Sequence, residues 1–599
     1  MEGAMFLKRL TRAKDGKRHS YWALVESVRT ARGPRHRVVT YLGELRSGQQ
    51  AGWAEVRRLL DQAGPETLPL FPETEPVPEA VHVHLRGVRV QGVREFGDVY
   101  LGWRLWQMLK LDECLRGCLP GGREEVPWSL MAALLTLARF CEPGSELATA
   151  QRWYPRTALS ELLGISPEVV NKDRLYRTLD AVLPHKAAIE RHLGEQFRTL
   201  FDASMDLVLY DLTSTYFEGA EGGNPQAKRG YSRDGRPDCV QVVIALVVTR
   251  EGLPLSYDVF AGNRPDVTTL EDVVKAMEAK HGALQHILVV DRGIASEANL
   301  AYLRSRGASY VVGTPKSRLK GLEGALVEGG WAEAAPGVEV KAVAGPDGVE
   351  TFVVCRSKER AAKEHAMHER FRERIEAGLT KLAGRLTTAR RRMDRGKVER
   401  QLGRLLERNA HAGRAFEIRV EDTAEAASGL NLTWTMDPMW AAWAQLTEGH
   451  YLLRTNLVGW TPAALWQSYI QLTQAEAAFR VHKSDLAIRP IWHQREERVQ
   501  AHILFSFLAF ALWKTLEQWM SRSELGSAPR PLREEMARLK VAEVRLPTST
   551  GREISLQCVT QPDPAQRQLL VRLGLTLPQR LGQPRWVEAV RSAPFRLKM

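Results

Sequence analysis

The order of apolar segments between residues 206 and 313 constrains the fold of this chain more than any other feature. Five stretches rich in Val, Ile, Leu and Tyr have the length of β-strands: 206–215, 239–249, 254–260, 286–291 and 309–313. Segments with helical periodicity precede the fourth and the fifth stretch, whereas only a short turn separates the second from the third. Three strands in a meander followed by helix, strand, helix and strand predict a mixed α/β sheet of five strands with flanking helices.

This element order is that of a ribonuclease-H-like core, and two acids occupy special places in it. Asp211 and Asp291 each lie at or near the C-terminal end of an apolar strand. A carboxylate next to an apolar interior is costly to leave unpaired, and two of them on neighbouring strands repel each other unless a cation lies between them. Mg²⁺ binds one or two carboxylates together with phosphate oxygens. The two acids therefore predict a site for divalent cations.

A third acid comes from residues 466–485, which contain no Gly or Pro and follow the helix-start signal Thr461-Pro462. On one continuous helix, Tyr469, Glu476, Arg480 and Lys483 share a stripe about 80° wide, with Ile470, Ala478 and Val481 on the packing side. Such a stripe offers one carboxylate for a metal ion and two cations for an anion. The simpler alternative is a solvated face held by a Glu476–Arg480 pair one helical turn apart.

Other residues compete for the same roles. Four further acids lie in this part of the chain: Asp206, Asp238, Asp258 and Asp266. Asp258 is the most credible alternative ligand, because it lies inside a strand, whereas the other three read as strand-start or cap residues. Three histidines, His482, His493 and His502, are interpreted as structural or DNA-facing, because chemistry on two metal ions needs no histidine. Three tryptophans, Trp434, Trp440 and Trp443, fit a core better than a platform for an unpaired base.

The chain of 599 residues is too long for one hydrophobic core. The sequence predicts an N-terminal antiparallel β unit with a helix, a proline-rich linker and a helical domain that could contact DNA, at residues 1–63, 64–95 and 96–200. The catalytic core is expected in two parts separated by an insertion domain with a basic helical hairpin, at residues 201–320, 456–520 and 321–455 respectively. A C-terminal α+β domain occupies residues 521–599.

The charge of the chain suggests a polyanionic partner. The formal net charge is +13, and residues 358–408 contain 16 Lys and Arg against 8 Asp and Glu. Nucleic acid is the commonest such partner of an intracellular protein. The six cysteines form neither a disulfide framework nor a zinc-binding pattern. Because no signal core or long apolar run is present, we expect a cytoplasmic protein without a membrane-spanning segment.

Three motifs in order resemble the DDE transposases of bacterial insertion sequences: Tyr210-Asp-Leu-Thr-Ser-Thr-Tyr-Phe-Glu-Gly219, Leu288-Val-Val-Asp-Arg-Gly293 and Tyr469-x2-Leu472-x3-Glu476-x6-Lys483. The third is similar to the Tyr-x2-Arg-x3-Glu-x6-Lys signature of the insertion-sequence-four-like superfamily. Residues 228–241, 262–266, 478–480 and 488–493 also resemble that group. One departure concerns Leu472, which replaces the signature arginine, and Arg480 on the same stripe is our candidate substitute.

The resemblance implies a ribonuclease-H-like fold with Asp211, Asp291 and Glu476 as the catalytic ligands of two Mg²⁺ ions, for which Mn²⁺ would substitute. It implies that Tyr469 and Lys483 contact DNA near the cleaved phosphate, with Arg480 in the place of the missing arginine. The expected activity is cutting at terminal inverted repeats and joining of the 3′ ends to target DNA. The expected assembly is a homodimer on paired ends of double-stranded DNA.

Two other functions fit the same sequence. A catalytically inactive DNA-binding or repressor protein could retain the fold, and a structure-selective nuclease could cut without strand transfer. All three would bind DNA with a steep salt dependence, so metal-dependent cleavage and joining distinguish them. An NTP-driven enzyme is disfavoured, because no Gly-x4-Gly-Lys-[Ser/Thr] motif is present.

Overall fold

The computed structural model describes residues 5–14, 17–30, 33–43, 77, 80–119, 121, 124–219, 223–281, 286–345 and 348–588. The chain divides into two compact units. The first unit comprises Met1–Arg89, Val544–Leu556 and Gln583–Met599. The second comprises Val90–Glu543 and Gln557–Gly582, and it contains every candidate site residue.

The first unit begins with an antiparallel sheet of order β1-β2-β3. Its strands are β1 (Met5–Lys14), β2 (Lys17–Thr30) and β3 (Gly33–Gly43). The helix expected around residues 49–63 and most of the expected linker lie outside the described residues. The end of the predicted linker is not a connection between domains, because Arg89–Glu95 forms strand β4 of a sheet. A four-stranded sheet of order β18-β17-β16-β4 satisfies the backbone groups of this strand.

The C-terminal part of the chain supplies the other strands of that sheet. They are β16 (Lys540–Pro547), β17 (Arg552–Val559) and β18 (Arg585–Glu588), accompanied by helices α19 (Pro529–Met536) and α20 (Pro564–Arg572). Helix α20 begins with a capping box, in which Asp563 accepts from the backbone of Gln566 and the Gln566 side chain accepts from the backbone of Asp563.

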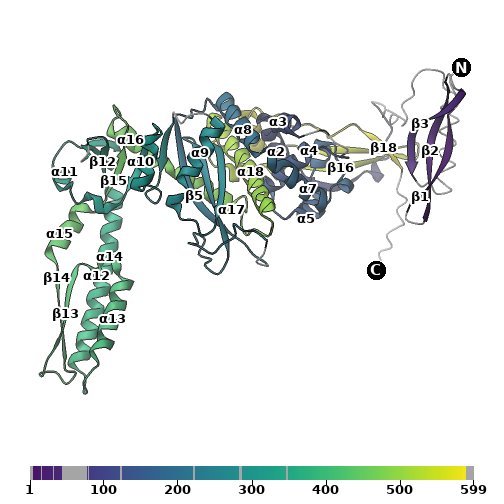
Figure 1. Ribbon diagram of the computed structural model, residues 1–599. Helices are drawn as coiled ribbons and strands as arrows, with labels where there is room; N and C mark the ends of the chain where they lie inside the picture. The colour runs from purple at the N-terminus through teal and green to yellow at the C-terminus, as the bar shows by residue number, and fades with distance from the viewer. Residues whose placement is uncertain are drawn as a thin grey trace. The chain divides into compact units, whose positions relative to one another are not determined.

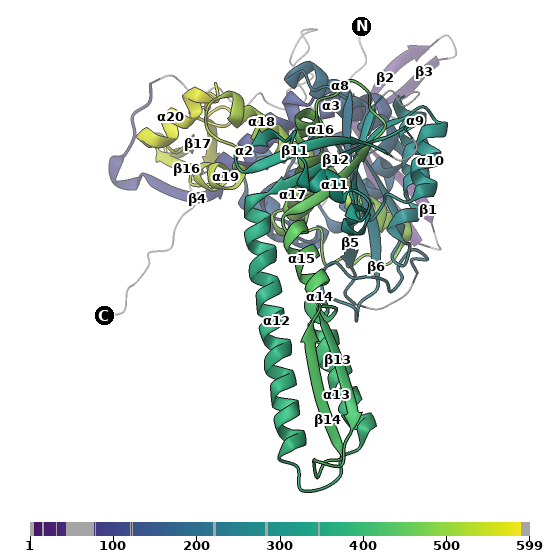
Figure 2. The same cartoon turned by 90° about the vertical axis from the view of Figure 1, so that its left-hand side faces the viewer.

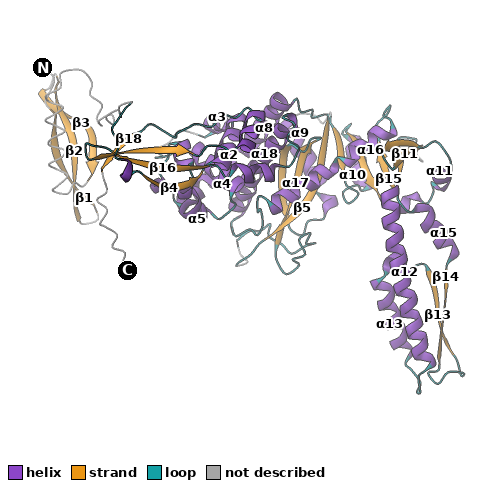
Figure 3. Ribbon diagram, turned by 180° about the vertical axis from the view of Figure 1, so that it is seen from behind, coloured by secondary structure: helices purple, strands orange, loops and turns teal. Residues whose placement is uncertain are grey.

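A bundle of helices surrounds the long helix α18 (Glu496–Arg522), as Figure 3 shows. Its main members are α2 (Gly97–Met108), α3 (Leu111–Cys118), α4 (Trp128–Cys141), α7 (Lys172–Val182) and α8 (Lys186–Phe201), with the short helices α5 (Glu146–Ala148) and α6 (Leu159–Leu163). By length and composition α18 could cross a membrane, but 94% of its apolar window is buried inside the protein. Helix α18 is therefore a core element, which explains why it is apolar on all sides.

A nine-stranded mixed sheet of order β10-β11-β12-β15-β9-β8-β5-β6-β7 forms the centre of the second unit. Five of its strands are the predicted ones: β5 (Leu207–Tyr216), β6 (Gln241–Thr249), β7 (Pro254–Ala261), β8 (Ile287–Val290) and β9 (Ser309–Thr314). Strands β5, β6 and β7 pair antiparallel, whereas β8 pairs parallel with both β5 and β9.

The sheet does not stop at five strands as predicted. Four strands from the range assigned to the insertion extend it: β10 (Ala332–Ala335), β11 (Val338–Ala344), β12 (Thr351–Ser357) and β15 (His450–Thr455). Strand β15 pairs antiparallel with β9 and so joins the two parts. Strands β10, β11 and β12 pair with their neighbours in sequence, but the pairs that join them to the predicted strands, β12 with β15 and β15 with β9, connect residues far apart in sequence, so the extension could not be predicted.

Helices cover both faces of this sheet. Helices α9 (Leu270–His281) and α10 (Glu297–Ser305) pack on one face, in a core shared with Val208 and Tyr210 of β5. Helices α17 (Leu472–Ser484) and α18 pack on the other face, in a core shared with Leu207 and Leu209. Figure 1 shows β5 between α9 and α17. Alternate residues of β5 therefore point to different helices.

The remainder of the insertion forms an arm that extends away from the sheet (Figure 2). The arm consists of α12 (Lys358–Thr387), α13 (Arg395–Arg408), α14 (Ala410–Gly413), the hairpin β13 (Phe416–Asp422) and β14 (Leu430–Met436), and α15 (Pro438–Thr447). A separate small core, which includes Ile375, Leu379 and Leu402, holds it together. Helices α12 and α13 form the basic pair indicated by the charge count. Helix α11 (Glu323–Val327) lies in the segment between β9 and β10.

Candidate active site

The register of two parallel strands brings Asp211 and Asp291 together. In the β5–β8 ladder Tyr210 lies opposite Val290, so the next residue of each strand is one of the two acids. Asp291 follows the last residue of β8, as predicted, but Asp211 is the fifth of ten residues of β5 rather than near its end. The strand continues because Leu212 to Tyr216 pair with β6. The two acids therefore lie side by side at the C-terminal end of β8, whereas β5 continues beyond Asp211.

Alternation along the strands shows which face this pair occupies. Asp211 has the same parity as Leu209, and Asp291 has the same parity as Val289, and both apolar residues belong to the core under α17 and α18. Both acids are half-buried. Both acids therefore point to the face of the sheet that α17 covers. Helix α17, which carries Glu476, packs directly against β5.

The electrostatics of Asp211 show that Glu476 lies within reach. Burial, together with the charges of Asp291 and Glu476, raises the pKa of Asp211 to about 7, against the Leu212 backbone N–H and the Arg233 charge. Among the described residues, no group of three His, Cys, Asp or Glu side chains is close enough to hold a metal ion. The three carboxylates are therefore electrostatic neighbours that do not form a shared ligand cage.

The helix that carries Glu476 differs from the one predicted. It is interrupted at Gln471 into α16 (Pro462–Ile470) and α17, so Tyr469 lies on a different helix from Glu476, Arg480 and Lys483. Ile470, expected to pack, is 41% exposed, and Leu472, which replaces the signature arginine, is buried. Glu476 and Arg480 remain together on the exposed side of α17.

Tyr469 lies at the end of α16 and contacts one of the strand acids. Its hydroxyl donates to Asp291 Oδ1 at 3.5 Å. Burial and the Asp291 charge raise the pKa of Tyr469 well above its ordinary value. Gly313 of β9 makes this position possible, because a Cβ on residue 313 would lie 2.5 Å from the Tyr469 hydroxyl. The phenol therefore remains protonated and lies against the strand next to the acid pair.

Lys483 is already paired inside the protein. Its ammonium donates to Asp234 Oδ1 at 2.7 Å, and the guanidinium of Arg489 donates to the same oxygen. Burial lowers the pKa of Lys483, while the Asp234 charge and hydrogen bond raise it. Arg480, by contrast, is exposed. The two cations predicted to contact DNA thus occupy different environments.

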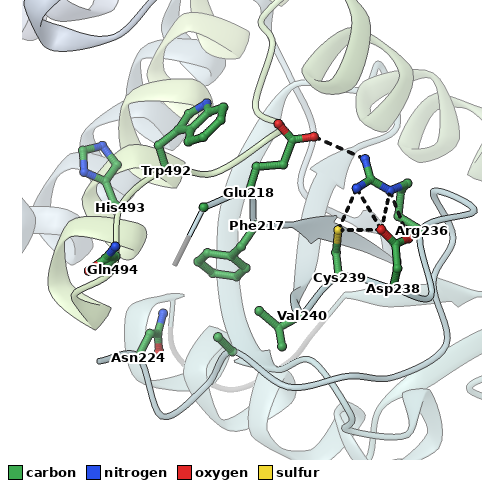
Figure 4. Close-up of a pocket in the computed structure, with 12 residues that line it drawn as sticks. Phe217, Glu218, Asn224, Arg236, Asp238, Cys239, Val240, Trp492, His493 and Gln494 are labelled. Atoms are coloured by element: carbon green, nitrogen blue, oxygen red, sulfur yellow. Dashed lines mark hydrogen bonds and ion pairs between the residues drawn. The ribbon is translucent and has the colours of Figure 1, made fainter. Parts of the chain in front are cut away.

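The rival acids have other partners or positions. Asp206 is exposed before the start of β5, at the opposite end from Asp291. Asp258 pairs with Ala245, and Ala245 pairs with Leu212, so these three side chains lie on the same face of the sheet. Leu212 and Asp211 are consecutive and point to opposite faces, so Asp258 lies on the face away from Asp211, where it pairs with Lys186 at 3.6 Å. Asp238 and Arg236 pair at 2.9 Å beside a pocket of about 250 Å³ that Trp492 also lines (Figure 4). Asp266 pairs with Arg233 at 2.5 Å. We name Asp211, Asp291 and Glu476 the acid cluster, and none of these four acids belongs to it.

The three histidines of this region contact other residues of the protein interior. His482 Nδ1 lies 2.9 Å from Ser506 Oγ, and His502 lies between Arg139 and the carbonyl of Ile488. His493 pairs with Glu146 at 3.2 Å. Trp434 and Trp440 pack on the core of the arm, and Trp443 packs on a neighbouring cluster, as expected for core residues. All six cysteines are free thiols.

Four residues near the acids were not singled out from the sequence: Arg233, Asp234, Gly313 and Arg489. Three of them lie in segments that carry the family resemblance, which was the only signal available. Except for Arg233, whose partner Asp266 is 33 residues away, their partners are separated from them by more than 150 residues, as in the contact between Asp234 and Lys483, so local patterns contain no information about these contacts.

Comparison with known proteins supports the family suggested by the motifs. A family model described as "Transposase DDE domain" matches residues 202–512, and one described as "IS1634 family transposase, N-terminal domain" matches residues 7–67. No curated protein matches the chain. A cryo-EM structure of a piggyBac transposase synaptic complex with hairpin DNA is similar with 9% identity and a TM-score of 0.34, covering 74% of this chain and 79% of that one. Since the first model spans more than half of the sequence, the chain belongs to the DDE transposase family and is a DDE transposase of an insertion sequence.

Proposed function

We propose that this transposase cuts DNA at the terminal inverted repeats of its element and joins the resulting 3′ ends to target DNA. The observation that carries the proposal is the register of β5 and β8, which sets Asp211 beside Asp291 on the face covered by α17. The charge of Glu476 reaches Asp211 from that helix. Three acids separated by 80 and 185 residues in sequence are thus electrostatic neighbours, which supports the proposal.

The donor set fits hard divalent cations, because it consists of carboxylates only. Asp211, Asp291 and Glu476 would hold two Mg²⁺ or Mn²⁺ ions, which when bound activate a water or a 3′ hydroxyl and stabilise the leaving oxygen of a phosphodiester. The protein itself positions these acids on two adjacent strands and one helix. Tyr469, Arg480 and Lys483 are proposed to contact the DNA backbone near the cleaved phosphate, and the protonated phenol of Tyr469 can donate to an anionic oxygen.

The wider assignments follow the same proposal. The order β7-β6-β5-β8-β9, with β8 parallel to β5, supports a ribonuclease-H-like layout for residues 201–320 and 456–520. Residues 96–200 and 321–455 would assist DNA binding, and residues 1–63 would form a segment of their own, whereas the end of 64–95 and part of 521–599 share one sheet. We further propose a homodimer on paired element ends, acting in the cytoplasm of a bacterial cell at the nucleoid.

The test is cleavage of a duplex that carries the element's end, with Mg²⁺ and with chelator. We expect metal-dependent nicking by the wild type and none by Asp291→Asn or Glu476→Gln at unchanged folding and DNA affinity. Full activity of either variant would refute the assignment of these acids. Binding without cleavage by the wild type would favour the inactive DNA-binding protein, and cleavage without a joined product would favour the nuclease.

A further inference from the structure

The loop between β5 and β6 contacts both the end of β5 and helix α17. We name residues 228–241 the strap. An antiparallel bridge ties its ends, with Lys228 N–H donating to Gln241 O at 3.1 Å and Gln241 N–H donating to Lys228 O at 2.9 Å. Gly230 lies against Gly262, because a Cβ at Gly230 would be 2.1 Å from the Gly262 carbonyl oxygen. The base of the strap is therefore fixed to the sheet.

Arg233 fixes the middle of the strap. Its backbone N–H donates to Ser214 Oγ on β5 at 3.2 Å, three residues beyond Asp211. Its guanidinium donates to Asp266 at 2.5 Å. The charge of Arg233 lowers the pKa of both Asp211 and Lys483, so Arg233 lies within electrostatic reach of the acids and of the cationic side of α17. The next residue, Asp234, is thereby held against α17.

Asp234 joins two cations from different segments. Its side chain is 2% exposed, and its Oδ1 accepts from Lys483 of α17 and from Arg489 of the segment after α17. That segment is itself paired with the end of β5, because Ile491 N–H donates to Tyr216 O at 2.9 Å. The other oxygen, Oδ2, is buried and has no partner among the described side chains and backbone groups.

The local charges do not balance. Arg233, Lys483 and Arg489 provide three positive charges, and within the described part of the chain their direct carboxylate partners are Asp234 and Asp266. The Arg489 side chain is 31% exposed and the Lys483 side chain is 14% exposed, so both retain access to solvent. A surplus positive charge beside three acids that are proposed to bind metal ions suits a phosphodiester, which carries one negative charge per nucleotide.

Position 472 of helix α17 does not supply the second cation of the signature. Leu472, which stands where the signature has arginine, is 6% exposed and packs in the core with Phe479. No cationic side chain can be offered to DNA from that position. Arg489, brought next to Lys483 by Asp234, is available at the same helix.

We propose that Arg489 and Lys483 form a two-cation site for one phosphate of the DNA next to the cleaved bond, and that Asp234 is the positioning residue that holds the two cations together. This inference rests on the proposed function, because it assumes that element ends lie over the acid cluster. Arg489 contacts the phosphate and belongs to the binding machinery. Asp234 contacts only the two cations and acts through them.

The test is a double-mutant cycle between the protein and single backbone phosphates. The ligand is a duplex with the element's end, in which one phosphate at a time around the cleavage position is replaced by an uncharged methylphosphonate. For the wild type, neutralising the contacted phosphate should lower affinity about tenfold to a hundredfold, as expected for a charged hydrogen bond. Arg489→Gln should bind the unmodified duplex more weakly and should lose less affinity than the wild type at that one position, because only Lys483 then contacts the phosphate.

Asp234→Asn should lose the same position dependence without a loss of affinity for an unrelated duplex, because the variant gains one net positive charge. The matched control is Glu350→Gln: Glu350 is also buried and accepts from two cations, Arg304 and Arg454, but it lies among β9, β12 and β15. The control should keep the position dependence of the wild type.

The outcomes are separable. An unchanged position dependence in Arg489→Gln overturns the inference, even if Asp234→Asn does not fold. A folded Asp234→Asn with wild-type position dependence removes the positioning role. Failure of the wild type to cleave the end duplex with Mg²⁺ contradicts the proposed function instead.

Discussion

Replacing Gly313 by alanine tests whether Tyr469 lies beside the acid pair. The new Cβ would lie 2.5 Å from the Tyr469 hydroxyl and 3.2 Å from its Cζ, so the phenol must retreat by roughly 0.9 Å to reach an ordinary contact of 3.4 Å. Overpacking of this kind costs about 1–3 kcal/mol of the free energy of unfolding. The retreat also removes the hydroxyl from Asp291 Oδ1, so DNA cleavage should fall as far as in Tyr469→Phe.

The assay is hydrogen–deuterium exchange of β9 peptides, which reports the free energy of local opening, together with end cleavage. In the Tyr469→Phe background the closest obstructing atom is gone, so Gly313→Ala should cost less than about 1 kcal/mol there. The matched control is Gly403→Ala in α13, where nothing lies within 4 Å of the added Cβ. That change should be neutral or stabilise by up to about 1 kcal/mol. Wild-type stability and activity of Gly313→Ala, or strict additivity with Tyr469→Phe, would refute the placement.

Three further predictions follow from the same structure. Asp258→Asn should cleave DNA like the wild type in the end-cleavage assay, because Asp258 lies on the other face of the sheet with Lys186; loss of cleavage would restore it as a ligand. Burial lowers the pKa of His482 to about 3, so below about pH 6.5 the unfolded state binds a proton that the folded state excludes, and stability is lost as the pH falls. Urea unfolding at pH 7 and pH 5 should show a loss of about 2 kcal/mol from this residue, absent in His482→Asn. Glu350→Gln should lower the free energy of unfolding by about 1.5–3 kcal/mol in the same titration, because Arg454 loses one of its two carboxylate partners and keeps Glu297; a loss below about 1 kcal/mol would contradict that role.

The central part of the fold could be predicted because its strands are long apolar runs separated by clear turn signals. Strands β5 to β9 appear where Val, Ile and Leu cluster, and the two acids interrupt those runs visibly. The extension by β10, β11, β12 and β15 could not be predicted, because strand pairing depends on partners far apart in sequence. The sequence predicts one helix where the structure has α16 and α17, because Gln471 at the break is neither Gly nor Pro and gives no local signal.

The sequence predicted that Asp211 and Asp291 lie on neighbouring strands, but it predicted less about the surroundings of the candidate cations. Asp211, Asp291 and Glu476 were recognisable from strand position and motif spacing. The sequence indicated Lys483 as a cation for DNA but contained no sign that Asp234 already pairs with it, 249 residues away. Such a pair depends on how the strap folds back onto α17, which only the tertiary structure reveals.

The central claim is that Asp211, Asp291 and Glu476 share divalent ions, and anomalous scattering from crystals grown with Mn²⁺ and an end duplex tests it most directly. The account predicts one or two anomalous peaks between the three carboxylates, about 4 Å apart where two are present, and their loss in Asp291→Asn. Mn²⁺ bound only elsewhere, or contacted by Asp258 in place of Glu476, would contradict it.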